Sequence, residues 1–114
     1  MDHERAHLIG SWSVIEIDGG ATLEAARPEV VFSEDGRLSG SGGVNRIFGP
    51  YQYERDILAA GLLASTMMAG PPDAMDQETL LLRILSAPLT VARHGDGELL
   101  LTSLDHILRL ARLD

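Results

Sequence analysis

The 114-residue sequence contains no cysteine and no lysine, so all nine of its positively charged side chains are arginines. Without a thiol there is no disulfide, zinc–thiolate site, iron–sulfur cluster or cysteine nucleophile. Without lysine, Schiff-base chemistry is excluded as well. The lack of cysteine does not decide the compartment, because it suits both a reducing cytoplasm and a disulfide-free exported protein.

Positive charge is also scarce and dispersed. The formal net charge is −8, and the arginines occur singly from Arg5 to Arg112, with no two adjacent in sequence. Binding to nucleic acid or to anionic lipid needs a basic face that neutralises phosphates. We therefore expect neither nucleic acid nor a lipid surface as a partner.

The chain has the length and the 45% hydrophobic content of one globular domain. Residues 1–7 are polar and charged, so we interpret them as a tail before a single domain over 8–114, and we expect no signal peptide. The protein is then cytoplasmic as the chain stands, or periplasmic or in the envelope if a leader was removed. An uncharged run over 57–72 is too short for a membrane span, which needs about 20 apolar residues. We interpret this run as buried core.

Short alternating segments separated by turn residues predict an antiparallel sheet of about seven or eight strands. The Asp35-Gly36 and Gly95-Asp96-Gly97 sequences are typical of hairpin turns, and Gly40 indicates a bulge or a close backbone approach. Residues 21–28 suit either a loop or a short helical turn. The strands are expected at 8–17, 29–33, 37–41, 51–54, 89–94, 99–102 and 107–111, with one or two more over 57–60 and 62–66.

One main helix is predicted from Asp73 to Leu85. Its first turns contain the acidic residues Asp73, Asp76 and Glu78, where negative charge favours the helix dipole. Ser86-Ala87-Pro88 ends the helix. An apolar face at helical spacing is formed by Met75, Leu81, Leu82 and Leu85. The predicted fold class is α+β, a strongly curved antiparallel sheet or half-open barrel covered by one helix.

Catalytic and metal-binding motifs are not found. His3 and His7 are four residues apart in a charged terminus, whereas His94 and His106 border turns and are expected to be exposed. A zinc site needs three or four converging ligands. The only strand carboxylates that suit a glycosidase-type pair are Glu16 and Glu54. We therefore expect no enzyme activity, no metal and no cofactor.

Two unusual segments distinguish this sequence. The first is Gly40-Ser41-Gly42-Gly43-Val44-Asn45-Arg46-Ile47-Phe48-Gly49-Pro50-Tyr51, which contains the only asparagine, and the second is Ser65-Thr66-Met67-Met68-Ala69-Gly70-Pro71. Together they resemble the META (HslJ-like) domain family. The matching positions are Gly43, Asn45, Arg46, Gly49 and Tyr51 in the first motif, Thr66, Met68, Ala69 and Pro71 in the second, and Trp12 and Glu78 outside them.

The resemblance covers about 8–110 and implies a small, strongly curved antiparallel sheet with one helix. It also implies loose links to heat shock, antibiotic tolerance and envelope or secretion phenotypes, with no established enzymatic activity. The family's two motif cysteines are replaced here by Val44 and Gly70. If those cysteines lie close together in the family, Val44 and Gly70 should be neighbours in this chain.

The signature residues have two interpretations. They either shape the backbone or form a binding site, for which the candidates are Asn45, Arg46, Tyr51, Thr66, Met68 and Glu78. The leading hypothesis is a non-enzymatic binding or scaffold module in stress or envelope physiology. A small apolar ligand would then lie in a cleft lined by Leu62, Leu63, Met67, Met68, Met75 and Leu82, unless these side chains simply fill the core.

Two alternatives remain open. In one, the domain is a protein–protein or homodimerisation module, monomeric or weakly dimeric, in which Arg46, Tyr51 and an exposed apolar patch dock a partner. The remote alternative is an undetected hydrolase, although the sequence assembles no acid–base or nucleophile set.

Overall fold

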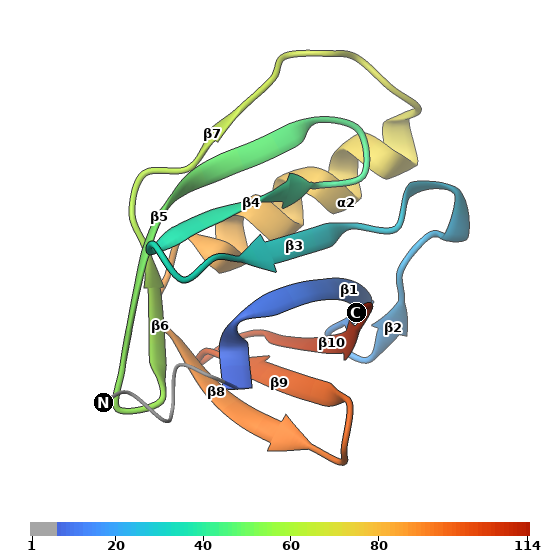
Figure 1. Ribbon diagram of the computed structural model, residues 1–114. Coiled ribbons are helices and arrows are strands. Elements are labelled where there is room, and N and C mark those ends of the chain that lie inside the picture. Colours follow the sequence, from blue (N-terminus) through green and yellow to red (C-terminus); the bar gives the residue numbers. More distant parts are fainter. Residues whose placement is uncertain (1–6) are drawn as a thin grey trace.

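A computed structural model describes residues 7–114 and shows a barrel of antiparallel strands with one helix (Figure 1). Short elements complete it: two strands of two residues, β2 (Gly20–Ala21) and β7 (Ala64–Ser65), and the 3-10 turn η1 (Glu24–Ala26). The helix is α2 (Pro72–Leu85). The eight longer strands are β1 (Gly10–Ile17), β3 (Glu29–Phe32), β4 (Arg37–Ser41), β5 (Arg46–Glu54), β6 (Ile57–Ala60), β8 (Leu89–His94), β9 (Glu98–Thr102) and β10 (Ile107–Arg112).

The sheet closes on itself, which goes beyond the half-open form that the sequence allowed. The strand order is β1-β3-β4-β5-β6-β8-β9-β10, and β10 pairs with β1 along most of its length. Every pairing is antiparallel, as predicted, because neighbouring strands are joined mostly by hairpins. Among the eight longer strands, the shortest ladder joins β6 to β8, where only Ile57 and Leu58 of β6 have partners on β8.

The predicted turns are present with the backbone geometry that their residues favour. Gly36 has φ +83° and Gly95 has φ +66° in the two hairpins. Gly40 has φ +145°, and a Cβ there would run into the Glu29 carbonyl on β3. The close backbone approach predicted at Gly40 is therefore confirmed.

Helix α2 begins one residue earlier than predicted, at Pro72, and ends at Leu85 as predicted. It passes behind β3 and β4 in Figure 1 and turns Leu81, Ile84 and Leu85 into the core that the barrel side chains form. Met75 and Leu82, two of the four residues of the predicted apolar face, are only half-buried. The buried stripe instead runs through Ala74, Glu78, Leu81, Ile84 and Leu85.

The strand expected at 51–54 is longer than predicted, since β5 begins at Arg46 and continues through Gly49 and Pro50. Pro50 lies opposite Arg37, at the end of the β4 ladder, and it precedes the residues that pair with β6. A proline is tolerated where the ladder changes partner, because its missing N–H interrupts little there.

The prediction that 57–72 is buried core is wrong. Leu58 is buried, but the exposed fraction is 93% for both Leu62 and Met67 and 61% for Met68. The strand expected at 62–66 shrinks to Ala64 and Ser65, and the chain then arches over the outside to the start of α2 (Figure 1). The barrel strands and α2 already fill the core, so most of 62–72 lies outside it, although Leu63 packs against it. Within residues 7–114, no helix is long and apolar enough to cross a membrane.

Candidate functional site

Asn45 and Glu78 meet in a buried hydrogen-bond network, each with an exposed fraction of 4%. Glu78 Oε1 accepts from the backbone N–H of Asn45 at 2.6 Å and of Val44 at 3.0 Å. Glu78 Oε2 accepts from Asn45 Nδ2 at 2.8 Å. A carboxylate that accepts several N–H bonds is stabilised even when it is buried, because those bonds replace its water.

The other end of the Asn45 amide holds the second signature segment. Asn45 Oδ1 accepts from the Thr66 hydroxyl at 2.8 Å and from the Met68 N–H at 2.7 Å, and Nδ2 also donates to the Met68 carbonyl at 3.1 Å. Thr66 Oγ1 accepts in turn from the Arg46 N–H at 3.1 Å. The structure thus brings together four of the six candidate residues, Asn45, Thr66, Met68 and Glu78.

This network suits the architectural interpretation of the signature. Its polar atoms join β5, the 66–68 segment and α2 to one another. Gly42 belongs to the same arrangement, because a Cβ there would come within 2.6 Å of Glu78 Cγ. Glu78 was expected to favour the dipole at the start of the helix; its position inside the core was not foreseen.

The remaining two candidates contribute no side-chain atom to the network: Arg46 joins it only through its backbone, and Tyr51 lies elsewhere in the core. Arg46 is exposed on β5. Tyr51 is a core residue with an exposed fraction of 4%: its hydroxyl donates to the Ser33 carbonyl at 2.7 Å, and its ring meets Phe32 edge-on. A role for Tyr51 in docking a partner is therefore not supported by its position.

Val44 and Gly70 are neighbours, as expected from the two replaced cysteines. A Cβ on Gly70 would lie 3.5 Å from Val44 Cβ and 2.9 Å from each Val44 methyl group. That spacing is within the range of Cβ separations in disulfides, about 3.5–4.5 Å. Glycine at 70 therefore makes room for the branched side chain at 44.

Next to this contact lies a cleft of about 440 Å³ between η1, the Gly43–Val44 turn and the first turn of α2. Small apolar residues make up most of its lining, and Glu24 and Asp73 are its only charged members. The full lining set is Leu23, Glu24, Ala25, Ala26, Gly43, Val44, Pro71, Asp73 and Ala74.

Two adjacent residues of α2 fix the walls of this cleft, which we call the η1–α2 cleft. Gln77 Oε1 accepts from the Leu23 N–H at 2.9 Å, and Gln77 Nε2 donates to the Ala26 carbonyl at 2.8 Å, so η1 is joined to the helix. Glu78 holds the opposite wall through the Val44 N–H. The cleft is therefore preformed.

Sequence reasoning placed the apolar lining elsewhere. None of the six residues predicted to line a cleft, Leu62, Leu63, Met67, Met68, Met75 and Leu82, lines the η1–α2 cleft. Leu62 and Met67 point outward in the surface segment instead. The sequence did not identify η1 as a wall of a cleft, because residues 21–28 have no periodic hydrophobic pattern. The only indication of an apolar surface there was the run from Leu23 to Ala26.

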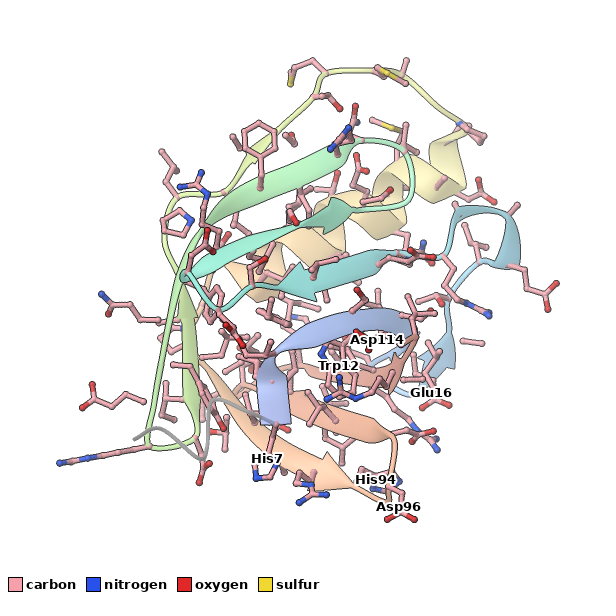
Figure 2. All side chains as sticks on the ribbon, in the orientation of Figure 1. His7, Trp12, Glu16, His94, Asp96 and Asp114 are labelled. Atoms are coloured by element: carbon pink, nitrogen blue, oxygen red, sulfur yellow. The ribbon has the colours of Figure 1, made fainter. Side chains whose placement is uncertain are left out.

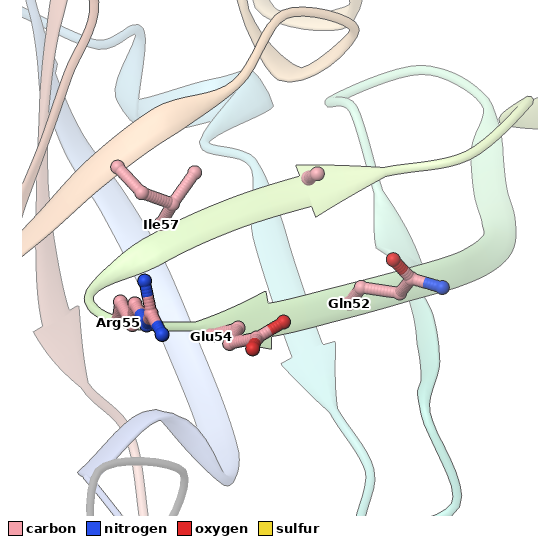
Figure 3. Close-up of a pocket in the computed structure, with 5 residues that line it drawn as sticks. Gln52, Glu54, Arg55 and Ile57 are labelled. Carbon is pink, nitrogen blue, oxygen red and sulfur yellow. The ribbon is translucent and has the colours of Figure 1, made fainter.

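A second hollow of about 360 Å³ lies on the outside of the β5–β6 hairpin, lined by Gln52, Glu54, Arg55, Ile57 and Ala59 (Figure 3). Glu16 is the other carboxylate considered for a glycosidase-type pair, and it does not line this hollow. Its Oε2 instead lies 3.5 Å from Arg109 Nη1. The two carboxylates therefore do not share this hollow.

The histidines are dispersed. Figure 2 shows His94 on the β8–β9 hairpin, away from α2, and that side chain is exposed as expected. His106 is only half-buried, and its Nδ1 lies 2.8 Å from Asp18 Oδ2. His3 lies outside the described residues, and within 7–114 no three His, Asp or Glu side chains gather as metal ligands would.

Solved structures share this fold. The chain is similar to a protein from Burkholderia xenovorans solved by NMR, with 24% identity, 95% of this chain and 85% of that chain covered, and a TM-score of 0.76. It is also similar to a second NMR structure, at 22% identity, with 92% and 90% covered and a TM-score of 0.75. A DUF4847 family protein from Bacteroides vulgatus matches at 15% identity, with 97% and 99% covered and a TM-score of 0.69. At these identities the likeness concerns the fold alone.

The fold and the buried network together define a class: a closed antiparallel barrel whose helix α2 is joined through Glu78 to Asn45, the residue before β5. A model of the META domain family matches residues 6–114, nearly the whole chain. The protein therefore belongs to the META domain family, and the resemblance of its two motifs is confirmed. A comparison with curated proteins gives no match.

Proposed function

We propose that this META domain is a non-catalytic binding module that holds a small apolar ligand in the η1–α2 cleft. The observation that carries the proposal is the cleft itself, about 440 Å³ in volume and lined mainly by small apolar side chains. Small-molecule sites are concave, mostly apolar and preformed, with volumes of about 300–1,000 Å³. Stress or envelope physiology is the setting that the family resemblance implies.

The hydrogen bonds around the cleft support a binding role. Gln77 and Glu78 are the polar side chains beneath the walls, and both use their polar atoms to hold the backbone of those walls. A rigid site loses little conformational freedom when a ligand enters it.

The proposal can be tested by NMR titration of the ¹⁵N-labelled protein with an uncharged apolar probe, n-hexanol. We expect hexanol to shift the amide resonances of Leu23, Ala26 and Val44. Replacing the exposed Ala25 with tryptophan should block the cleft and remove these shifts. The matched control is Ala87→Trp, an exposed position beyond the end of α2 that should leave them unchanged. Hexanol shifts that are absent from the cleft, or that persist in Ala25→Trp, would refute the proposal.

A second candidate function is docking of a protein, including a second copy of the chain. The observation that favours it is the exposure of Leu62, Met67 and Met68 in a segment without any charged residue over 57–72. Exposed apolar patches on soluble proteins often mark protein interaction sites. This uncharged surface segment is called the 62–68 loop below.

A further inference from the structure

We infer that the η1–α2 cleft selects ligands that carry a positive charge beside their apolar body, such as alkylamines. This inference rests on the proposed function of the cleft and adds the chemical class of its ligand. The juxtaposition that carries it is an apolar cleft whose charged lining residues, Glu24 and Asp73, are both acidic and exposed.

The two carboxylates belong to different walls. Glu24 is the first residue of η1, and Asp73 lies in the first turn of α2. An amine at the mouth of the cleft would therefore have an acidic residue on each side, while its alkyl part meets Leu23, Ala26 and Val44. Opposite charges at such a site favour the charged form of an amine over an uncharged analogue.

Among residues 7–114, no ion pair engages these carboxylates. Arg27 follows η1 directly, but its guanidinium binds Thr22 instead. Arg27 Nε donates to Thr22 Oγ1 at 3.0 Å, and Arg27 Nη2 donates to the Thr22 carbonyl at 3.2 Å. No arginine lines the cleft. No residue that lines the cleft therefore neutralises the carboxylates of Glu24 and Asp73.

The start of α2 would ordinarily attract an anion, because its free N–H groups and its dipole present positive charge. Here Pro71 and Pro72 have no N–H, the Ala74 N–H donates to Asp73 Oδ1 at 2.8 Å, and the Met75 N–H donates to the Pro71 carbonyl at 2.9 Å. Few donors remain for an anion, and the Asp73 carboxylate opposes the dipole. The helix start therefore does not reverse the preference for a cation.

The magnitude should be modest, because both carboxylates are exposed to water. Exposed charge pairs usually change an equilibrium by a small factor, so two of them should favour an amine over the matching alcohol by about 3- to 20-fold in Kd. The preference should shrink as salt is added.

The test compares n-hexylamine, n-hexanol and hexanoate, which share one alkyl chain, by NMR titration at pH 7. We expect hexylamine to bind most tightly and hexanoate most weakly. The double variant Glu24→Gln with Asp73→Asn should bring the Kd of the amine close to that of the alcohol. Asparagine at 73 keeps an oxygen that can accept from the Ala74 N–H, so the helix start is preserved.

The control variant removes two negative charges elsewhere, with Glu34→Gln and Asp96→Asn in hairpin turns outside the cleft lining. It should keep the preference for the amine. Equal binding of amine and alcohol to the wild type, or an equal loss of preference in the control, would overturn the inference and leave the proposed function intact. If neither hexanol nor hexylamine binds at the cleft, the proposed function itself fails.

Discussion

The carboxylate of Glu78 accepts hydrogen bonds from both the backbone and the side chain of Asn45, at 2.6 Å and 2.8 Å. The amide orientation is fixed, because Asn45 Oδ1 accepts from Thr66 and Met68 and so turns Nδ2 toward Glu78. Only an acceptor at position 78 satisfies that geometry. The pairing explains why an acidic residue lies in the buried stripe of a helix that otherwise contributes apolar side chains.

The first prediction concerns Glu78→Gln. The new amide nitrogen would face the Asn45 Nδ2 donor, and the charge-assisted bonds to the two backbone N–H groups would weaken. We expect the free energy of unfolding to fall by about 1–3 kcal/mol, the usual cost of an unsatisfied buried polar group. Urea denaturation followed by circular dichroism measures it.

The matched control for Glu78→Gln is Asp76→Asn, which removes the same charge from an exposed position of the same helix. It should change the free energy of unfolding by less than about 0.5 kcal/mol. If the two variants were equally stable, the network would not contribute to the fold as described.

The second prediction concerns Val44→Cys with Gly70→Cys. A Cβ at position 70 would lie 3.5 Å from the Cβ of Val44, which suits a disulfide, and the backbone at 70 lacks the positive φ that would disfavour cysteine. The pair should oxidise readily, since no other thiol competes, and closing a loop of 26 positions (70 minus 44) should stabilise the protein by at most about 3.5 kcal/mol. Thiol titration and melting with and without reductant measure both effects. A pair that stays reduced in air would contradict the geometry.

The sequence predicted the fold well wherever local chemistry decides the structure. Asp35-Gly36 marks its hairpin because glycine takes the positive φ of the turn, and α2 ends as predicted before Pro88. Closure of the barrel was not predicted. It depends on β1 pairing with β10, and no local pattern records contacts between strands so far apart in sequence.

The sequence predicted residues of the buried network but not the residues that line the cleft, and both outcomes have physical causes. Asn45, Thr66, Met68 and Glu78 were selected by resemblance, but which atoms they join depends on tertiary packing. The 62–68 loop was misjudged because an apolar run usually signals burial. In the folded chain, the barrel strands and α2 fill the core, which leaves Leu62 outside it.

The third prediction concerns pH and the Asp18–His106 pair. Hydrogen bonds from the His106 ring and the Ile107 N–H lower the pKa of Asp18 below its ordinary value of 3.8. A folded-state pKa below the unfolded one stabilises the fold fully above pH 3.8, and this stabilisation is lost as the pH falls through the lowered pKa. Asp18→Asn should therefore reduce stability more at pH 6 than at pH 2. Urea denaturation at both pH values measures this, and equal effects of the variant at the two pH values would contradict it.

The last prediction tests the 62–68 loop as a docking surface for a second copy. Leu62 and Met67 are each 93% exposed, so replacing both with glutamate should change the free energy of unfolding by less than about 0.5 kcal/mol. If the loop docks a second copy, sedimentation velocity should show concentration-dependent association of the wild type and a monomeric double variant. Like charges facing each other across the interface would prevent docking.

Leu104 supplies the control for the docking test, because it is fully exposed in the turn between β9 and β10 and is not part of the 62–68 loop. Leu104→Glu adds charge to an equally exposed leucine, so it should leave association unchanged if the effect belongs to the 62–68 loop. A wild type that remains monomeric at all concentrations would rule out docking between copies. Equal loss of association in Leu104→Glu would mean that added negative charge, rather than the loop, controls it, since the chain already carries a net charge of −8.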